Sequence, residues 1–381
     1  MVEPTYEYEH GVLYCGNVNS VLDELPEESV DCIVTSPPYF GLRDYGTASW
    51  VGGDENCSHE FGRHMRGGTL DGKDANFQNN NMGSYGDEAV KIGEACPKCG
   101  AVRKDLQVGL EQTPQEYIER LVEVFRSLRR VLKEDGVAWL NLGDTYWGGK
   151  GRSGAGSKKA HRERTSKTLQ GEHTYLGKSK GFRPQDRTSD IFKPKDLMMI
   201  PHRVAIALQE DGWWVRQDIV WHKNNPMPES VRDRCTKAHE YIFLLTKSKK
   251  YFYDHVAVKE ASQDTWKGRR GKRKQRIKQQ SALGDRIFDD EVEYHEGMKR
   301  NRHSVWKVPV FAYKGAHFAT YPPKLIEPCI LAGCREGGVV LDPFVGSGTT
   351  CVVAQEHGRH FIGIDLNHEY LALADARISN S

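Results

Sequence analysis

One stretch near the C-terminus restricts the fold more than any other. Residues 339–358 read VVLDPFVGSGTTCVVAQEHG, an apolar run followed by a glycine-containing turn and an apolar helix start. Gly346 and Gly348 permit positive φ and close approach of the backbone to a ligand. The next apolar run, HFIGIDLN, ends in Asp365, 17 residues after Gly348, where an acid can accept hydrogen bonds from a ribose diol. The pattern predicts a parallel α/β unit that binds a nucleotide-type ligand.

The glycine loop differs from the two commonest phosphate-binding signatures. It lacks the Gly-Lys-Ser/Thr ending of a Walker A loop and the third glycine of a dinucleotide fingerprint. A tight turn alone would explain the glycines about as well, so the acid at this spacing is what favours ligand binding. We also expect Thr349 and Thr350 to cap the helix that follows.

Alternating strand and helix patterns extend this unit along the chain. Apolar runs that predict strands lie at 11–18, 30–36, 136–144, 213–221, 240–248, 338–344 and 360–367. Helical spacing marks 114–136, which ends in an Asp-Gly pair suited to a C-cap, and also 200–212 and 320–334. We predict a Rossmann-like, doubly wound, mostly parallel sheet of seven strands. The runs 213–221 and 240–248 have no helical segment between them and predict an antiparallel pair.

Three stretches do not fit the sheet and are interpreted as insertions: 50–108, 150–190 and 255–316. Residues 150–187 and 267–278 are strongly basic, although the formal net charge of the chain is only +2. Two basic segments outside a core favour a polyanion partner over solvated loops without a ligand.

The sequence VTSPPYF places two prolines where the strand expected at 30–36 would otherwise continue. Consecutive prolines fix the backbone, so the Pro37 carbonyl is held in one direction, and Tyr39 offers a ring for stacking. Taken alone, this stretch could be an ordinary turn at the end of a strand.

Three motifs together, TSPPY, DPFVGSGTT and GIDLN, resemble those of the DNA amino-methyltransferases that use S-adenosylmethionine. In that family an Asp/Asn/Ser-Pro-Pro-aromatic tetrapeptide is the catalytic loop. Here the tetrapeptide precedes the cofactor loop, an order similar to that of the permuted β group. The resemblance implies a circularly permuted core with double-stranded DNA as partner and S-adenosylmethionine as cofactor.

The resemblance also implies roles for individual residues. The catalytic loop is Ser36, Pro37, Pro38 and Tyr39, in which the Ser36 hydroxyl and the Pro37 carbonyl accept hydrogen bonds from the exocyclic amine of a flipped base. Expected cofactor contacts are Asp342, Phe344, Gly346, Ser347, Gly348 and Thr349 on the methionine side, Asp365 on the ribose, Asn17 near the adenine, and His317, Phe318, Ala319 and Thr320 from a further motif.

Ser36 at the first position of the tetrapeptide bears on the substrate. In the family, SPPY is usual for N4-cytosine enzymes and DPPY for N6-adenine enzymes, so we expect a methyltransferase for cytosine N4 in duplex DNA, with adenine N6 as the alternative.

Two further hypotheses are methylation of RNA or of a protein side-chain amide, and a catalytically inactive zinc-containing DNA-binding module. Cytosine C5 methylation is disfavoured because the Pro328-Cys329 dipeptide lies in an apolar helical segment away from the loop.

Two short stretches, ENCSHEFGRH and ACPKCGA, resemble the halves of a zinc site. Cys96 and Cys99 have zinc-knuckle spacing, and Cys57 and His59 complete four ligands, with His64 in reserve. Such a zinc would be structural, since no reaction step calls for a metal; the alternative is a set of reduced thiols in a loop.

The segments of the chain are therefore assigned as follows: 1–49 and 109–254 to the catalytic part of the core, 50–108 to a zinc-binding insertion, 150–190 to a basic mobile loop within the core, 255–316 to target recognition, and 317–381 to the cofactor-binding part.

Within 218–254, the likeness to the family suggests seven candidates for the base pocket or the DNA path: Trp221, Lys223, Asn224, Pro226, Pro228, Glu229 and Ser230. A connecting loop held by its prolines explains these residues equally well.

No export signal and no apolar run of bilayer length are evident, so we expect a cytoplasmic protein without membrane contact, either a monomer or a homodimer.

Overall fold

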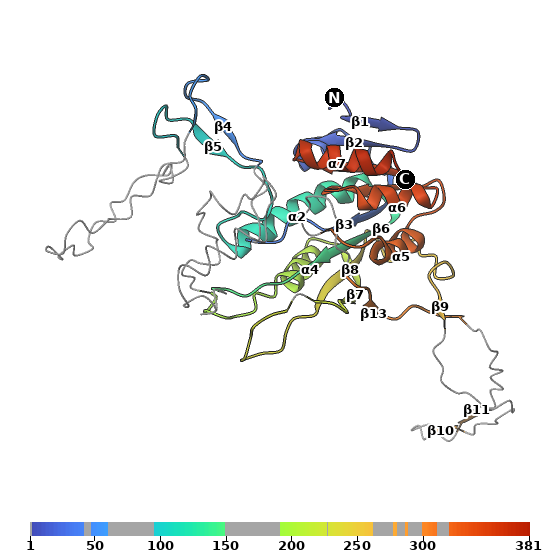
Figure 1. The fold of residues 1–381 in the computed structure, drawn as a ribbon. Coiled ribbons are helices and arrows are strands. Elements are labelled where there is room, and N and C mark those ends of the chain that lie inside the picture. Colours follow the sequence, from blue (N-terminus) through green and yellow to red (C-terminus); the bar gives the residue numbers. More distant parts are fainter. Residues whose placement is uncertain are drawn as a thin grey trace.

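A nine-stranded mixed sheet forms the centre of the chain (Figure 1). The structure, a computed structural model, describes residues 2–41, 47–59, 95–148, 191–226, 228–261, 277–279, 286–288, 299–310 and 320–381. In spatial order the strands are β1 (Tyr6–Tyr8), β2 (Gly11–Cys15), β15 (His360–Asp365), β14 (Val339–Asp342), β3 (Val30–Thr35), β6 (Leu132–Leu142), β8 (His239–Thr246), β7 (Trp214–His222) and β13 (Val305–Lys307).

The pairing is mostly parallel. β2, β15, β14, β3 and β6 form a continuous parallel block, whereas β8 runs antiparallel to both β6 and β7. The predicted fold class and the predicted antiparallel pair are therefore confirmed.

The sheet has two strands more than predicted, one at each edge. β1 pairs antiparallel with β2, and β13 pairs parallel with β7. The expectation that 255–316 lies wholly outside the sheet was therefore wrong for Val305–Lys307. Each of these strands has only three residues, too few for the alternation of apolar and polar residues that marks a strand in sequence. In β13 the Trp306 side chain is 6% exposed, and its ring centre lies 6.4 Å from the ring centre of Trp139.

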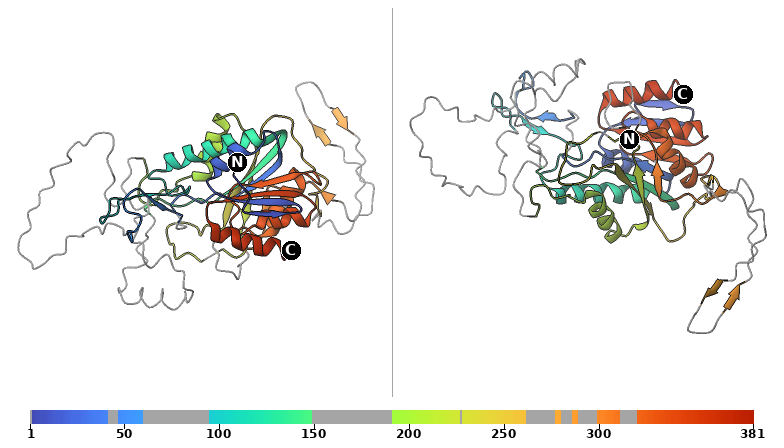
Figure 2. Two further views of the ribbon diagram at one scale, coloured as in Figure 1. Left: turned by 90° about the horizontal axis from the view of Figure 1, so that it is seen from above. Right: turned by 60° about the horizontal axis from the view of Figure 1, so that its bottom comes forward.

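Helices cover both faces of the sheet (Figure 2). One face carries α1 (Val18–Glu24), α2 (Pro114–Val131) and α4 (Ile200–Glu210), and the other carries α5 (Pro323–Gly333), α6 (Thr349–Glu356) and α7 (His368–Ile378). The buried side chains fall into two apolar clusters accordingly, one on each side of the sheet. This is the layering of a doubly wound α/β fold.

Helix α2 shows how local chemistry fixes a boundary. Thr113 and Glu116 form a capping box at its start. The predicted end at Asp135-Gly136 was wrong, because Leu132 already pairs with Val30 and the strand β6 begins there. Gly136 serves close packing instead, since a Cβ at this position would lie 2.6 Å from the Leu132 side chain.

The start and the end of the chain meet at one edge of the sheet. β2 pairs with β15 along five residues, and α7 packs on both strands (Figure 1). A circular permutation requires this adjacency; the permutation itself stays a prediction.

Three further ladders lie outside the main sheet. They pair β4 (Ser49–Val51) with β5 (Val102–Lys104), β9 (Glu260–Ala261) with β12 (Lys299–Arg300), and β10 (Ile277–Gln279) with β11 (Arg286–Phe288). The stretch 150–187, nearly all of 267–278, and His64 lie outside the described residues, so the predictions for them are untested. Within the described ranges, no helix combines the length and the apolar character needed to cross a bilayer.

Candidate functional site

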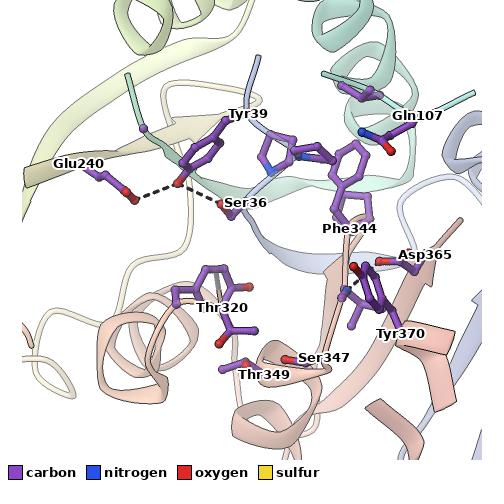
Figure 3. Close-up of a pocket in the computed structure, with 18 of the residues that line it drawn as sticks. Ser36, Tyr39, Gln107, Glu240, Thr320, Phe344, Ser347, Thr349, Asp365 and Tyr370 are labelled. Atoms are coloured by element: carbon purple, nitrogen blue, oxygen red, sulfur yellow. Dashed lines mark hydrogen bonds between the residues drawn. The ribbon is translucent and has the colours of Figure 1, made fainter. Parts of the chain in front are cut away.

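A cavity of about 910 Å³ opens where the parallel strands end (Figure 3). Ligands of open α/β sheets bind at the carboxyl ends of the strands. The cavity is lined by the predicted catalytic loop on one side and by the predicted cofactor loop on the other. Segments that are about 300 residues apart in sequence therefore face one space.

The predicted catalytic tetrapeptide follows β3 directly, and all four of its residues line the cavity. The Tyr117 hydroxyl of α2 donates a hydrogen bond of 2.9 Å to the Pro38 carbonyl, and the Gly41 amide donates one of 2.8 Å to the Gly109 carbonyl. Gly109 has φ +99°, and a Cβ there would lie 3.0 Å from the Tyr39 carbonyl oxygen. The loop is thus fixed by its prolines and by close contact with the chain entering α2.

Tyr39 is anchored by its hydroxyl. It donates to Glu240 Oε2 at 2.9 Å, with Asn141 Oδ1 as a second acceptor at 3.2 Å, and it accepts from Ser36 Oγ at 3.4 Å (Figure 3). Its ring lies against Gly143, where a Cβ would approach Tyr39 Cε2 to 2.5 Å. Burial, and then the nearby Glu240 carboxylate, raise the pKa of Tyr39 well above its usual value, so the phenol stays protonated.

Glu240 and Lys223 were only partly anticipated from the sequence. Lys223 Nζ forms an ion pair with Glu240 Oε1, and both side chains are mostly buried, at 20% and 16% exposure. Lys223 Nζ also lies 4.5 Å from the Trp221 ring centre. Lys223 was among the candidates of 218–254, but Glu240 is the first residue of the strand predicted at 240–248 and carries no local signal of a site.

The other candidates of 218–254 divide into two groups. Pro226, Pro228 and Glu229 line the cavity together with Lys223. Trp221 is buried in the core, and Asn224 and Ser230 do not line the cavity.

The glycine loop forms the opposite wall. Gly346 has φ +50°, and its amide donates a 2.9 Å hydrogen bond to Asp365 Oδ2, while Asn367 N donates to Oδ1 at 2.8 Å. Burial raises the pKa of Asp365 to about 6. Each carboxylate oxygen has a second lone pair, so this acid can still accept hydrogen bonds from a diol.

Ser347 and Thr349 also line the cavity, and both are held by α7. Arg377 Nη1 donates to Ser347 Oγ at 2.8 Å and to Thr349 Oγ1 at 3.0 Å. The predicted capping by Thr349 and Thr350 was wrong: α6 begins after Gly348 without a side-chain cap, because Arg377 and a buried carboxylate take these hydroxyls.

That carboxylate is Asp342, which is 2% exposed and does not line the cavity. It accepts hydrogen bonds from Thr35 Oγ1 and Tyr321 OH, both at 2.8 Å, from the Phe344 amide at 3.1 Å, and from Thr350 Oγ1. Burial raises its pKa, while these donors act in the opposite direction. Asp342 therefore joins the strand before the catalytic loop to the strand before the cofactor loop.

The remaining predicted cofactor residues are placed as follows. Asn17, Thr320 and Phe344 line the cavity, and Asn17 Oδ1 also caps α1 by accepting from the Asn19 amide at 3.0 Å. Gly348 lies outside the lining and serves packing, since a Cβ there would lie 2.9 Å from Ala374 Cβ. His317, Phe318 and Ala319 lie outside the described residues.

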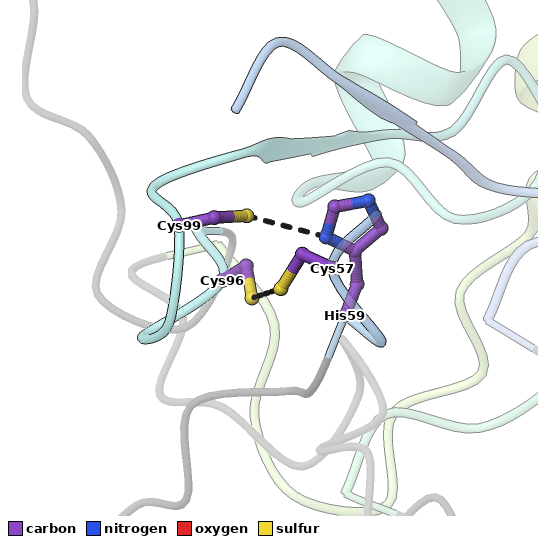
Figure 4. Close-up of side chains that lie close together, drawn as sticks. All are labelled: Cys57, His59, Cys96 and Cys99. Atoms are coloured by element: carbon purple, nitrogen blue, oxygen red, sulfur yellow. Dashed lines mark hydrogen bonds between the residues drawn. The ribbon is translucent and has the colours of Figure 1, made fainter. Parts of the chain in front are cut away.

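The predicted zinc ligands come together in the insertion (Figure 4). The ligand atoms of Cys57, His59, Cys96 and Cys99 all lie within 4.8 Å of one another. Cys57 Sγ lies 3.9 Å from Cys96 Sγ, and Cys99 Sγ lies 3.3 Å from His59 Nδ1. Hydrogen bonds from the backbone of Ala101 and then Asp54 lower the pKa of Cys99, which favours the thiolate form that binds metals.

The same insertion supplies part of the cavity wall, which the sequence did not predict. Its strand β5 leads into Leu106, Gln107 and Val108, all of which line the cavity. Thr47, just before the insertion, is tied to its end by a hydrogen bond of 2.9 Å that Thr47 Oγ1 donates to Asp105 Oδ1. Tyr370 of α7 is a further unpredicted lining residue (Figure 3).

Comparison with known proteins places this site in context. A family described as DNA methylase matches residues 30–376. The Type II methyltransferase M.Cfr9I of Citrobacter freundii is 37% identical over 372 residues, which cover 98% of this chain and 89% of that protein. The Type II methyltransferase M.SmaI of Serratia marcescens is 37% identical over 363 residues, which cover 95% of this chain and 89% of that protein.

Among solved structures, a PvuII DNA methyltransferase described as cytosine-N4-specific has a similar fold. The TM-score is 0.54 at 17% sequence identity, and the match covers 98% of this chain and 88% of that chain. This likeness supports the fold assignment.

Proposed function

Since the chain belongs to the DNA methylase family of S-adenosylmethionine-dependent amino-methyltransferases, we propose that it methylates the exocyclic N4 amine of a flipped cytosine in duplex DNA. The observation that carries the proposal is that Ser36–Tyr39 and the 343–349 loop line one cavity and that Asp342 links the strands before them. Such a cavity can hold a methyl donor and an acceptor amine side by side.

The acceptor side explains the need for the tetrapeptide. An exocyclic amine is a poor nucleophile, because its lone pair is delocalised into the ring. The Ser36 hydroxyl and the Pro37 carbonyl can accept hydrogen bonds from the two N–H groups and aim the lone pair at the methyl group. A base inside a duplex cannot reach them, so it must be flipped out.

On the donor side, S-adenosylmethionine supplies an electrophilic methyl group on a sulfonium. Asp365 is proposed to hold the ribose, Gly346, Ser347, Thr349 and Phe344 the methionine side, and Asn17 and Thr320 further parts. Asp342 and Gly348 act through the loop rather than by contact.

Ser36 is the reason for preferring cytosine over adenine. We therefore propose incubation of mixed-sequence duplex DNA with labelled cofactor, followed by mass spectrometry of the nucleosides. Label in N4-methylcytosine is expected; label in N6-methyladenine would replace the substrate assignment, and absence of label from DNA would overturn the function. Calorimetric titration with S-adenosylmethionine distinguishes the methyltransferase from the inactive DNA-binding module, because the inactive module predicts no heat of binding.

We further propose that Cys57, His59, Cys96 and Cys99 hold a structural zinc ion. Tetrahedral zinc with bonds of about 2.3 Å to sulfur and 2.0–2.1 Å to nitrogen spaces its ligands by about 3.5–3.8 Å, close to the observed separations. Metal analysis should find one zinc per chain, none in Cys96→Ser, and one in the control Cys235→Ser, whose thiol is exposed and outside the cluster. A metal-free wild type with intact fold would reject the site.

The relatives' description as Type II methyltransferases supports a role in a restriction–modification system. Cytoplasmic localisation, a monomeric or homodimeric state, and the assignment of 255–316 to target recognition stay predictions.

A further inference from the structure

The hydrogen bonds around Tyr39 have a direction. Ser36 Oγ donates to the Tyr39 oxygen at 3.4 Å, and the Tyr39 hydroxyl donates to Glu240 Oε2 at 2.9 Å. The first bond is long, which is common for catalytic hydrogen bonds before substrate binds. The two bonds together form a path that leads from the tetrapeptide to a carboxylate on β8, and Figure 3 shows its three members in line.

Methylation of an amine creates a need for such a path. The nitrogen lone pair forms the new N–C bond as the sulfonium C–S bond breaks, and the electron pair of that bond stays on sulfur. The nitrogen then carries a positive charge and one proton too many. This proton is acidic, because its loss returns a lone pair to conjugation with the ring.

We propose that Glu240 is the terminal acceptor of this proton, reached through Ser36 and Tyr39. The amine proton passes to Ser36 Oγ, the Ser36 proton to the Tyr39 oxygen, and the Tyr39 proton to Glu240 Oε2. Charge and protons balance: the base ends neutral, Ser36 and Tyr39 are unchanged, and Glu240 ends protonated. The inference rests on the proposed function, because it concerns the same amine.

The surroundings of Glu240 suit this role. Lys223 pairs with Oε1 and so places a cationic partner on that oxygen, which leaves Oε2 for Tyr39. Glu240 lines the cavity, so the proton can return to solvent after the product leaves. The protonated phenol of Tyr39 matches a relay in which it gains one proton as it gives up another, without forming a phenolate.

Two isosteric variants interrupt the path at different points. Glu240→Gln keeps an oxygen that can accept from Tyr39 but cannot take up the proton, and Tyr39→Phe removes only the hydroxyl and leaves the Lys223–Glu240 pair in place. Asp218→Asn on β7 is the matched control, because its carboxyl is exposed and lies outside the cavity. Single-turnover methyl transfer to duplex DNA would be measured at saturating cofactor.

We expect each isosteric variant to slow the methyl-transfer step about 100-fold, the size usual for a proton-transfer group, while the Kd values for cofactor and DNA change less than about threefold. The double variant should be no slower than the slower single one, because both interrupt one path. Asp218→Asn should match the wild type.

The outcomes separate the two levels of the proposal. A wild type that labels no DNA rejects the proposed function itself. If the wild type is active, the relay is overturned when the methyl-transfer rate of Glu240→Gln lies within about threefold of the wild-type rate. It is also overturned when Glu240→Gln is slow but Tyr39→Phe transfers methyl groups at the wild-type rate. Should Glu240→Gln fail to fold, judged by its thermal transition, Tyr39→Phe decides alone.

Discussion

The two halves of the cavity are built in different ways. The proposed cofactor half comes mainly from one continuous stretch, 343–370, in which the glycine loop, a helix, a strand and the start of the next helix follow one another. The proposed base half is assembled from separated segments: the tetrapeptide, the insertion end at 106–108, Gly143 and the residues around β8. A continuous unit can be recognised from its spacing, whereas an assembled one depends on the order of strands in the sheet.

If the halves are functionally separate, Ser36→Ala should give the largest effect and confine it to turnover. Loss of one acceptor that orients the amine is expected to lower turnover by roughly 100- to 1,000-fold. Cofactor affinity, measured by titration calorimetry, should stay within about threefold of the wild type. A parallel loss of cofactor affinity would mean that the loop also supports the cofactor half.

The converse change is Asp365→Ala in the cofactor half. It leaves the Gly346 and Asn367 amides without their acceptor and removes the proposed ribose partner, so the cofactor Kd should rise roughly 10- to 100-fold. Turnover at saturating cofactor should change little. Asp23→Ala, which removes an exposed acid of α1, is the control. An unchanged Kd would show that the ribose lies elsewhere.

The insertion supplies part of the wall of the base half, and removal of the proposed metal tests whether the metal holds this wall in place. Cys96→Ser should loosen the segment that carries Gln107 and lower kcat/KM for DNA by about tenfold, the lower end of effects from disturbed metal-site surroundings. Cofactor affinity should be kept, and Cys235→Ser should behave as the wild type. Equal kcat/KM values for both cysteine variants would show that the wall stands without metal.

The smallest expected effect is the pH dependence of cofactor affinity. The Asp365 carboxyl, with its pKa raised to about 6, is ionised above neutral pH and protonated below, so affinity should be highest above pH 7 and fall as the pH drops. At pH 5.5 the fall should be about fourfold, because roughly a quarter of the carboxyl is then ionised. Asp365→Asn should give a flat profile; an unchanged pH profile in that variant would assign the dependence to another group.

The raised pKa of Asp365 has the opposite effect on the stability of the free protein, to which its contribution decreases as the pH rises. The folded-state pKa of about 6 lies above the ordinary value of 3.8, so the native state binds this proton more tightly than the unfolded chain. Its stabilising contribution is fully present below about pH 4 and is lost as the pH rises through about 6.

The difference between the halves also explains what the sequence could predict. Gly346 and Asp365 were found from local spacing, and Ser36–Tyr39 from the motif that follows a strand. Glu240 was missed, because it stands 201 residues from its partner Tyr39 and reads as the start of an ordinary strand. Gln107 was missed because only the fold shows that the insertion returns to the cavity.

Asp342 was assigned to the cofactor from its motif, and its actual contacts were not predictable. Phe344 and Thr350 lie in the same loop and helix start, but Tyr321 stands 21 residues before Asp342 and Thr35 stands 307 residues before it, which no local pattern records. The sheet edges escaped prediction for a simpler reason, since three-residue strands have no period to read.

The hydrogen bonds of Asp342 have a consequence for how such enzymes diversify. One buried side chain joins the strand before the tetrapeptide to the strand before the glycine loop, and none of its four donors belongs to 50–108, 150–190 or 255–316. We therefore expect that the segments proposed to recognise DNA can differ between relatives while this link within the core is kept.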